Sequence, residues 1–133
     1  MAMQEARMLF RPNATAPAMG RRILDGLVDE LPLSTLDDAR LLLTELITNA
    51  IQHGHLEHGD RISVTVRREA AALLVEVSDP GDGIPPLDGR PPGSSNGWGM
   101  TLLDRLADSW GVEPVPEGGT FAWFRLTSAR VTK

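Results

Sequence analysis

Glu45, Asn49 and His53 are spaced four residues apart in a segment with helical periodicity. Because an α-helix advances about 100° per residue, the three side chains form one polar stripe along the helix. A carboxylate one turn from a carboxamide suits a general base beside a hard-cation ligand, since Mg²⁺ prefers oxygen donors. The alternative is a solvated helix face with an ordinary i,i+4 pair, which is the commoner explanation of this spacing taken alone.

Asp79 ends a predicted strand, and glycines follow it at Gly81 and Gly83. Strand parity places Asp79 on the same side as Val75 and Val77, which is the buried side. An ionised carboxylate there needs hydrogen-bond donors, and an amino-substituted heterocycle provides one. The two glycines would let a flat ring approach the backbone. In isolation, a tight turn rich in Asp and Gly explains the same segment more simply.

Gly97, Gly99, Met100 and Thr101 lead directly into a further predicted helix. The unpaired amides at a helix start attract anions, and glycines leave those amides accessible. This segment could therefore hold phosphate groups. A flexible loop explains a single Gly-x-Gly equally well, and no strand precedes it, which argues against a Rossmann turn.

Composition excludes several classes of protein. The chain has 133 residues, of which 41% are hydrophobic and 23% charged, as in an ordinary single soluble domain. The absence of cysteine excludes disulfides, zinc ribbons, iron–sulfur clusters and thiol catalysis. The only lysine is Lys133, so neither a P-loop nor the strand lysine of a eukaryotic-type protein kinase can be built. Any bound phosphates must be held by other means.

Charge and hydropathy limit the classes of partner and the cellular location to be expected. The net charge of −5 argues against nucleic acid as a direct ligand. The apolar runs are too short to span a bilayer, and no charged-then-apolar leader precedes Phe10. We therefore expect a cytoplasmic protein that does not enter a membrane.

The elements that position these residues follow from hydrophobic periodicity. The sequence predicts an edge strand at about residues 7–11, followed by helices over 19–31 and 36–53, with Ser34 as the N-cap of the second helix. Two strands follow at 61–67 and 73–78. A third helix has a face that runs from Met100 to Trp110, and closing strands are predicted at 112–116 and 120–126. Residues 80–98 lack periodicity and predict a lid or a disordered segment. This order indicates a single α/β domain over residues 1–133, a two-layer sandwich with helices on one face of a mixed, mainly antiparallel sheet.

Taken together, the three polar segments resemble the N, G1 and G2 boxes of the gyrase, histidine kinase and MutL ATPase superfamily, the Bergerat ATP-binding fold. The resemblance covers residues 9–126 and is strongest to the bacterial anti-sigma-factor serine kinases. Residues 44–54 are similar to their N box, residues 97–102 to their glycine-rich helix start, and residues 118–120 to their final hairpin.

The resemblance implies roles for individual residues. Glu45 would be the general base and Asn49 the Mg²⁺ ligand. Asp79 would accept the adenine amino group, and Thr120 would support the same pocket from the neighbouring strand. The other residues expected to bind ATP are His53, Gly81, Gly83, Gly97, Gly99, Met100 and Thr101, beneath a lid at about residues 84–96.

The function implied is that of an ATP- and Mg²⁺-binding anti-sigma-factor serine/threonine kinase, which takes part in transcription regulation. Such a protein sequesters a sigma factor and phosphorylates an antagonist protein. The alternative is a non-catalytic, ATP-gated binding module of the same fold. Retention of Glu45 favours the kinase, whereas the uncharged Ser94-Ser95-Asn96 before the glycines favours the module. The sequence leaves open which sigma factor and antagonist are bound, which residue is phosphorylated and whether the chain forms a homodimer.

Overall fold

The computed structural model describes residues 4–26, 31–53, 55–69, 71–81 and 100–127. Along the chain these residues form β1 (Gln4–Phe10), α1 (Ala16–Asp25), α2 (Leu33–His53), β2 (Ile62–Glu69), β3 (Ala72–Asp79), α3 (Met100–Leu106), β4 (Ser109–Pro114) and β5 (Thr120–Thr127). This order of helices and strands is the one predicted from the sequence.

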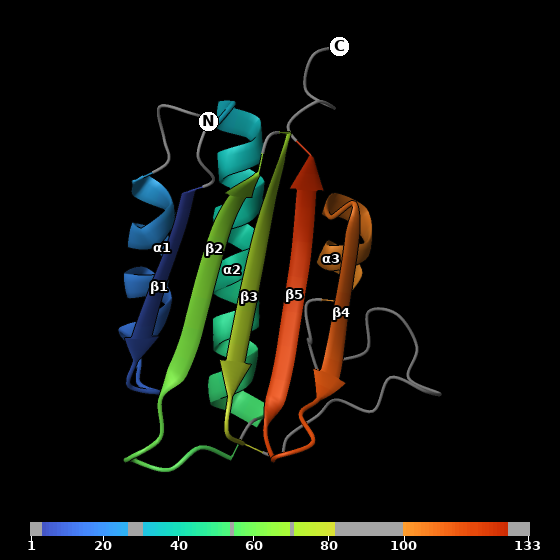
Figure 1. Cartoon of the computed structure of the whole chain (residues 1–133). Helices are drawn as coiled ribbons and strands as arrows, with labels where there is room; N and C mark the ends of the chain where they lie inside the picture. The colour runs from blue at the N-terminus through green and yellow to red at the C-terminus, as the bar shows by residue number, and fades with distance from the viewer. Residues whose placement is uncertain (1–3, 27–30, 54, 70, 82–99, 128–133) are drawn as a thin grey trace.

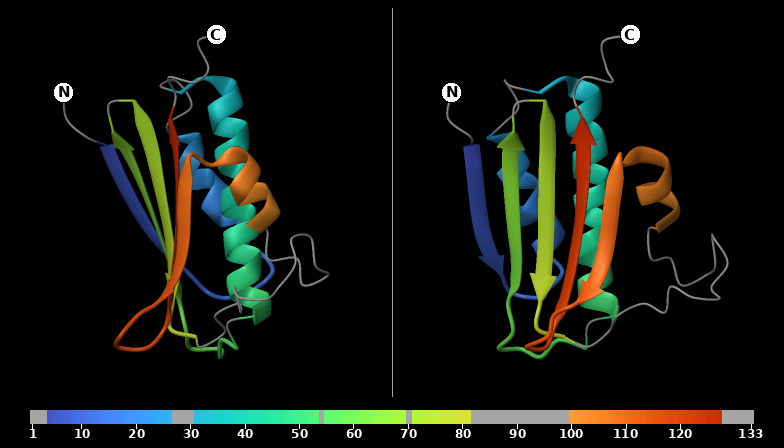
Figure 2. Two further views of the ribbon diagram at one scale, coloured as in Figure 1. Left: turned by 90° about the vertical axis from the view of Figure 1, so that its right-hand side faces the viewer. Right: turned by 45° about the vertical axis from the view of Figure 1, so that its right-hand side comes forward.

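The strands form one sheet in the order β1-β2-β3-β5-β4. The helices α1, α2 and α3 lie on one face of this sheet, and no described helix covers the other face (Figures 1 and 2). The predicted two-layer sandwich is therefore confirmed. Each neighbouring pair of described strands is antiparallel, whereas the sequence predicts a partly mixed sheet. Periodicity reports which face a residue occupies and carries no information on the direction of the neighbouring strand.

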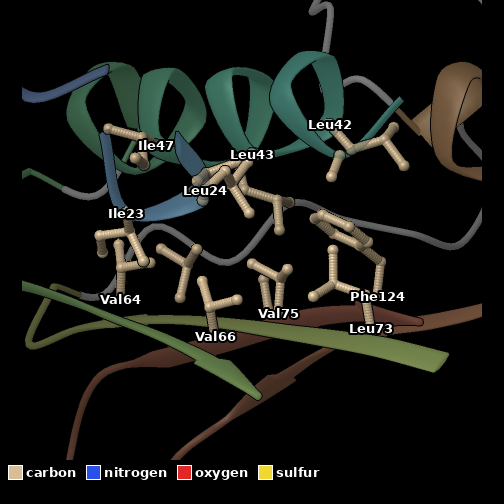
Figure 3. Close-up of a cluster of buried hydrophobic side chains, with 14 of the residues drawn as sticks. Ile23, Leu24, Leu42, Leu43, Ile47, Val64, Val66, Leu73, Val75 and Phe124 are labelled. Carbon is tan, nitrogen blue, oxygen red and sulfur yellow. The ribbon is translucent and has the colours of Figure 1, made fainter. Parts of the chain in front are cut away.

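The core lies between α2 and the inner face of the sheet, as Figure 3 shows. Side chains three and four residues apart form the buried stripe of α2, which comprises Leu36, Ala39, Leu42, Leu43, Leu46, Ile47 and Ala50. Alternate residues of the strands face this stripe, among them Val64, Val66, Leu73, Val75 and Phe124. The two periodicities therefore meet in one apolar layer, which holds α2 against the sheet.

A glycine lets α1 approach α2 closely. A Cβ added to Gly20 would collide with the Ile47 side chain and touch that of Leu43. Both of these residues belong to the buried stripe of α2. The missing side chain at this position thus allows the two helices to share one core.

The bounds of all three helices differ from the prediction. The first helix, predicted over residues 19–31, spans Ala16–Asp25. Residue Ser34 was expected to cap α2, but the helix already begins at Leu33, and the Leu36 N–H donates to the Pro32 carbonyl at 3.0 Å. Pro32 thus supplies the first acceptor, which is compatible with its lack of an N–H. Residue Trp110 was expected on the face of α3, but it lies in β4, because α3 ends at Leu106.

The strands differ from expectation in smaller ways. β1 begins at Gln4, and β4 spans Ser109–Pro114, three residues earlier than predicted at its start. Thr65 points to the uncovered face of the sheet by its parity, yet it is buried. The Arg7 side chain reaches it and donates from Nε to the Thr65 Oγ1 at 3.2 Å, which explains the burial.

The predicted lid, residues 84–96, lies outside the described residues, as does Leu27 of the predicted first helix. None of the helices in the described part of the chain combines the length and apolar character needed to cross a membrane.

Candidate functional site

Asp79 and Thr120 form the last residue pair between β3 and β5, so both lie at the same end of the sheet. Both polar side chains are buried, with 9% and 8% of their surface exposed. The Thr120 Oγ1 has no hydrogen-bond partner among the described residues. A buried hydroxyl without a partner costs free energy, so such a group calls for a ligand or water.

Among the described residues, one hydrogen bond to the Asp79 carboxylate is found. Its Oδ1 accepts a hydrogen bond from the Gly81 N–H at 2.7 Å. Burial raises the pKa of Asp79 above the usual 3.8, the Gly81 bond lowers it in part, and the Asp60 carboxylate raises it again. An external N–H donor would stabilise the charged form in this position, since ionised acceptors form the stronger hydrogen bonds.

The turn between β4 and β5 packs against the end of β3. Gly118 and Gly119 have φ angles of 105° and 121°, a region that L-residues rarely adopt. A Cβ at Gly119 would collide with the Asp79 carbonyl oxygen, whereas one at Gly118 would meet nothing within 4 Å. Gly119 is therefore the residue that lets the hairpin turn close over Asp79.

Sequence reasoning placed Gly119 only in a hairpin and missed its contact with β3. The available signal was the Gly-Gly pair directly before a strand. That signal predicts a turn, but it does not reveal which backbone the turn approaches.

The C-terminal half of α2 lies over this same end of the sheet (Figure 1). Asn49 is almost completely buried, with 2% of its surface exposed, and Glu45 is half-buried one turn earlier. The alternative of a plain solvated stripe therefore fails at Asn49. A buried carboxamide inside a helix needs specific hydrogen-bond partners, which distinguishes Asn49 from a solvated side chain.

The residues present fit an adenine nucleotide with magnesium. Asp79 and Thr120 are buried polar groups at one strand end, and Gly81 and Gly119 bring backbone close to them. No group of three or more His, Cys, Asp or Glu side chains in the described part of the chain could hold a metal alone. Mg²⁺ bound through one protein oxygen and substrate phosphates needs no such group, and Asn49 could supply that oxygen.

The remaining predicted site residues are placed only in part. His53 is the last residue of α2, and Met100 and Thr101 are the first residues of α3, but their side chains are outside the described part of the structure. Gly83, Gly97 and Gly99 lie outside the described residues altogether. Of the predicted base-binding residues, the described geometry brings Asp79, Gly81 and Thr120 together at one end of the sheet, where the C-terminal half of α2 also lies.

Residues 13–125 match the histidine kinase-like ATPase domain. The chain is similar to anti-sigma F factors, with 31% identity over 96 residues to the protein from Clostridium acetobutylicum, covering 66% of this chain and 67% of the relative. For the anti-sigma F factor of Pasteuria penetrans, the identity is 29% over 132 residues, covering 90% and 88% of the two chains.

Solved structures share the fold. The structure of the RsbU and RsbW domains of a Mycobacterium tuberculosis protein superposes with a TM-score of 0.67 and 17% identity over 93% of this chain. The histidine kinase domain of a blue-light-activated histidine kinase from Erythrobacter litoralis superposes with a TM-score of 0.53 and 26% identity over 74% of this chain. This chain spans 32% of the first and 47% of the second.

Proposed function

The chain belongs to the histidine kinase-like ATPase domain family, and we propose that it is an ATP- and Mg²⁺-binding anti-sigma factor with serine/threonine kinase activity. The observation that carries this proposal is the buried pair of polar side chains at the ends of β3 and β5, Asp79 and Thr120. The similarity to anti-sigma F factors supports the regulatory role.

Adenine fits the donor and acceptor pattern of this pair. A carboxylate offers two oxygens with several lone pairs, so Asp79 can accept from the adenine amino group while keeping its bond to Gly81. Guanine carries a carbonyl where adenine carries the amino group, and that carbonyl would face the carboxylate. The hydroxyl of Thr120 can both donate and accept, directly or through a water.

Helix α2, which carries the residues similar to the N box, would contact the phosphates and their metal ion. Asn49 would provide an oxygen to Mg²⁺, which neutralises phosphate charge when bound. Glu45 would take the proton of the serine or threonine hydroxyl as that oxygen bonds to the γ-phosphorus and the bond to ADP breaks. The family resemblance adds His53, Gly83, Gly97, Gly99, Met100 and Thr101 to the nucleotide-binding set.

The relatives named anti-sigma F factors support a sigma factor as a partner. We propose that this chain sequesters a sigma factor and that its phosphate acceptor is an antagonist of that complex. A non-catalytic, ATP-gated module of the same fold is the second candidate, because no basic residue occurs in Ser94-Ser95-Asn96 before the glycine-rich segment.

Two measurements test the proposal. Calorimetry with ATP, GTP and ADP in the presence and absence of Mg²⁺ should show Mg²⁺-dependent binding with adenine preferred over guanine. Incubation with γ-labelled ATP and candidate antagonist proteins should then transfer label to a serine or threonine. Absence of ATP binding would refute the whole proposal, whereas binding without transfer to any antagonist would leave the module.

A further inference from the structure

The sheet face that no described helix covers carries a stripe of apolar side chains (Figures 1 and 2). Phe121 and Trp123 are two residues apart on β5, so both side chains point to this face. Leu74 of β3 pairs with Arg125, which is the next outward residue of β5 after Trp123. The three apolar side chains therefore form one diagonal stripe across the two neighbouring strands.

Trp123 lies over the backbone of the edge strand β4. Its direct partner in the β4–β5 pair is Gly111, and a Cβ added to that glycine would lie 2.7 Å from Trp123 Nε1 and 3.0 Å from Cε2. The indole thus occupies the space above Gly111 and covers it, which stabilises this strand pair. Trp123 nevertheless remains only half-buried, so part of its ring still faces solvent.

The stripe departs from the usual composition of such a face. An antiparallel sheet with one solvated side normally alternates apolar residues inward with polar residues outward. Leu74, Phe121 and Trp123 point outward and are each half-buried, although no described helix or strand lies over them. Contiguous apolar side chains on a surface mark protein interaction sites, and aromatic residues are enriched in the centres of such sites.

One end of the stripe is basic. Leu74 lies between two arginines, because its partner on β2 is Arg67 and its partner on β5 is Arg125. Arg67 donates from Nη2 to Glu5 Oε2 at 3.2 Å. Arg125 is exposed and forms no ion pair within the described residues. Its charge is therefore available to a carboxylate from outside the chain.

The rest of the stripe is acidic. Phe121, at the other end, pairs with the exposed Glu113 of β4, and Trp123 pairs with Glu76 of β3. An α-helix carries a partial positive charge at its N-terminus and a partial negative charge at its C-terminus. A helix laid along the stripe parallel to β5 would begin beside Glu113 and end beside Arg125, so both of its ends would meet opposite charge.

From this charge complementarity we propose that the uncovered sheet face binds an amphipathic α-helix of a partner protein, parallel to β5 and with carboxylates in its last turn. From Phe121 to Arg125 the strand rises about 13 Å, which matches about nine helical residues. Apolar side chains at i, i+4 and i+7 of that helix would contact the stripe. The inference goes beyond the proposed nucleotide site, which none of these residues belongs to.

The test uses the full chain and a phage-displayed library of helical peptides. The library fixes leucines at i, i+4 and i+7 and leaves the other positions free. Selection on the immobilised wild type should enrich peptides with Asp or Glu in the last turn. Fluorescence anisotropy should then show that the most enriched peptide binds at least about 10-fold more tightly than the same residues in reversed order, because the reversed peptide places its carboxylates near Glu113.

Two variants connect this binding to the stripe. Trp123→Thr removes the central aromatic side chain and should weaken peptide binding by about 10- to 100-fold. Arg125→Glu should weaken it by about 3- to 30-fold, and a peptide with lysines in place of its last-turn acids should restore the loss. Arg22→Glu is the matched control, since it makes the same charge change at an exposed residue of α1 on the helix-covered side of the sheet. This control should bind the peptide as the wild type does.

Folding and nucleotide binding are measured separately. Circular dichroism and calorimetry with Mg-ATP should give wild-type results for Arg125→Glu, so a loss of peptide binding is distinct from a failure of the nucleotide site. If Trp123→Thr fails to fold, Arg125→Glu and its lysine-containing peptide still decide. A selection that enriches no peptide, a reversed peptide that binds equally well, or an unchanged affinity in Arg125→Glu would each overturn the proposal.

Discussion

Gly119 lies so close to the Asp79 carbonyl oxygen that no side chain can stand between them. The contact joins the β4–β5 turn to the end of the central strand β3, where the Asp79 carboxylate is held. The position of the proposed base-binding carboxylate of Asp79 thus depends on Gly119, which has no side chain that could contact the base.

We expect Gly119→Ala to reduce both stability and ATP affinity. The substitution combines an unfavourable φ of 121° with a collision against backbone, and positive-φ strain alone costs about 1–3 kcal/mol. Gly118→Ala is the matched control, because its φ is also positive but its Cβ would meet open space. Chemical denaturation should show a larger loss for residue 119, and calorimetry should show weaker ATP binding for that variant alone. Equal losses would mean that the collision with Asp79 is unimportant.

Asp79→Asn should weaken ATP binding while stabilising the free protein at neutral pH. A hydrogen bond to a charged group contributes about 1.5–3 kcal/mol, so the ATP dissociation constant should rise about 10- to 150-fold. The folded-state pKa of Asp79 is raised, so protonation favours the folded state. The wild type should therefore gain stability relative to the variant as the pH falls through the folded pKa towards the usual 3.8.

Thermal unfolding without nucleotide, measured from pH 7 downwards, tests the predicted difference in stability between the wild type and Asp79→Asn. The advantage of the variant should be greatest at neutral pH and should shrink on acidification. A variant that is less stable than the wild type at neutral pH would show that the carboxylate is well satisfied in the free protein, and calorimetry with unchanged affinity would remove Asp79 from the base site.

Thr120→Val should weaken ATP binding without lowering the stability of the free protein, as Asp79→Asn should, but here the group removed is a neutral hydroxyl. The Thr120 Oγ1 is buried without a described partner, so replacing it with a methyl of similar size should leave the free energy of unfolding equal or higher by about 1 kcal/mol. The loss of one neutral hydrogen bond should weaken ATP binding by about 2- to 12-fold. Thr120→Ser keeps the hydroxyl and should bind ATP nearly as the wild type does. If the valine and serine variants bind ATP equally, the hydroxyl has no part in recognition.

Glu45→Ala should abolish phosphate transfer without affecting ATP binding. Loss of a general base reduces rates by about 10²- to 10⁴-fold, whereas a half-buried carboxylate one turn from Asn49 need not contact the nucleotide in the ground state. Single-turnover transfer of label to an antagonist measures the first quantity, and calorimetry with Mg-ATP measures the second. Transfer at the wild-type rate would show that another group takes the proton.

The sequence predicts those parts of the site that depend on the periodicity of helices and strands. The buried stripe of α2 and the inward direction of Asp79 follow from spacings of 3.6 and 2 residues, and both are confirmed. Trp110 was misplaced because its distance from Leu106 fits a helix face equally well. The structure instead places it in a strand, where its Nε1 donates to Asp104 at 2.9 Å.

Contacts between distant segments could not be predicted from spacing. The pairing of Asp79 with Thr120 depends on β5 returning beside β3, and the role of Gly119 depends on a turn meeting a backbone from another strand. The burial of Thr65 likewise results from Arg7 reaching across from β1. Each of these requires the order of strands in the sheet, which local periodicity does not encode.

The position of β3 in the middle of the sheet has a consequence for the lifetime of the protein. β1 and β4 are edge strands that can fray singly, whereas β3 is paired on both sides, so the full separation of β3 from its neighbours requires the sheet to come apart. A ligand that binds there only in the folded state therefore stabilises the whole chain, by RT ln(1 + [L]/Kd). With ATP as that ligand, the adenylate level of a cell would set how often this protein opens to proteases. Energy starvation would then lower its abundance as well as its occupancy.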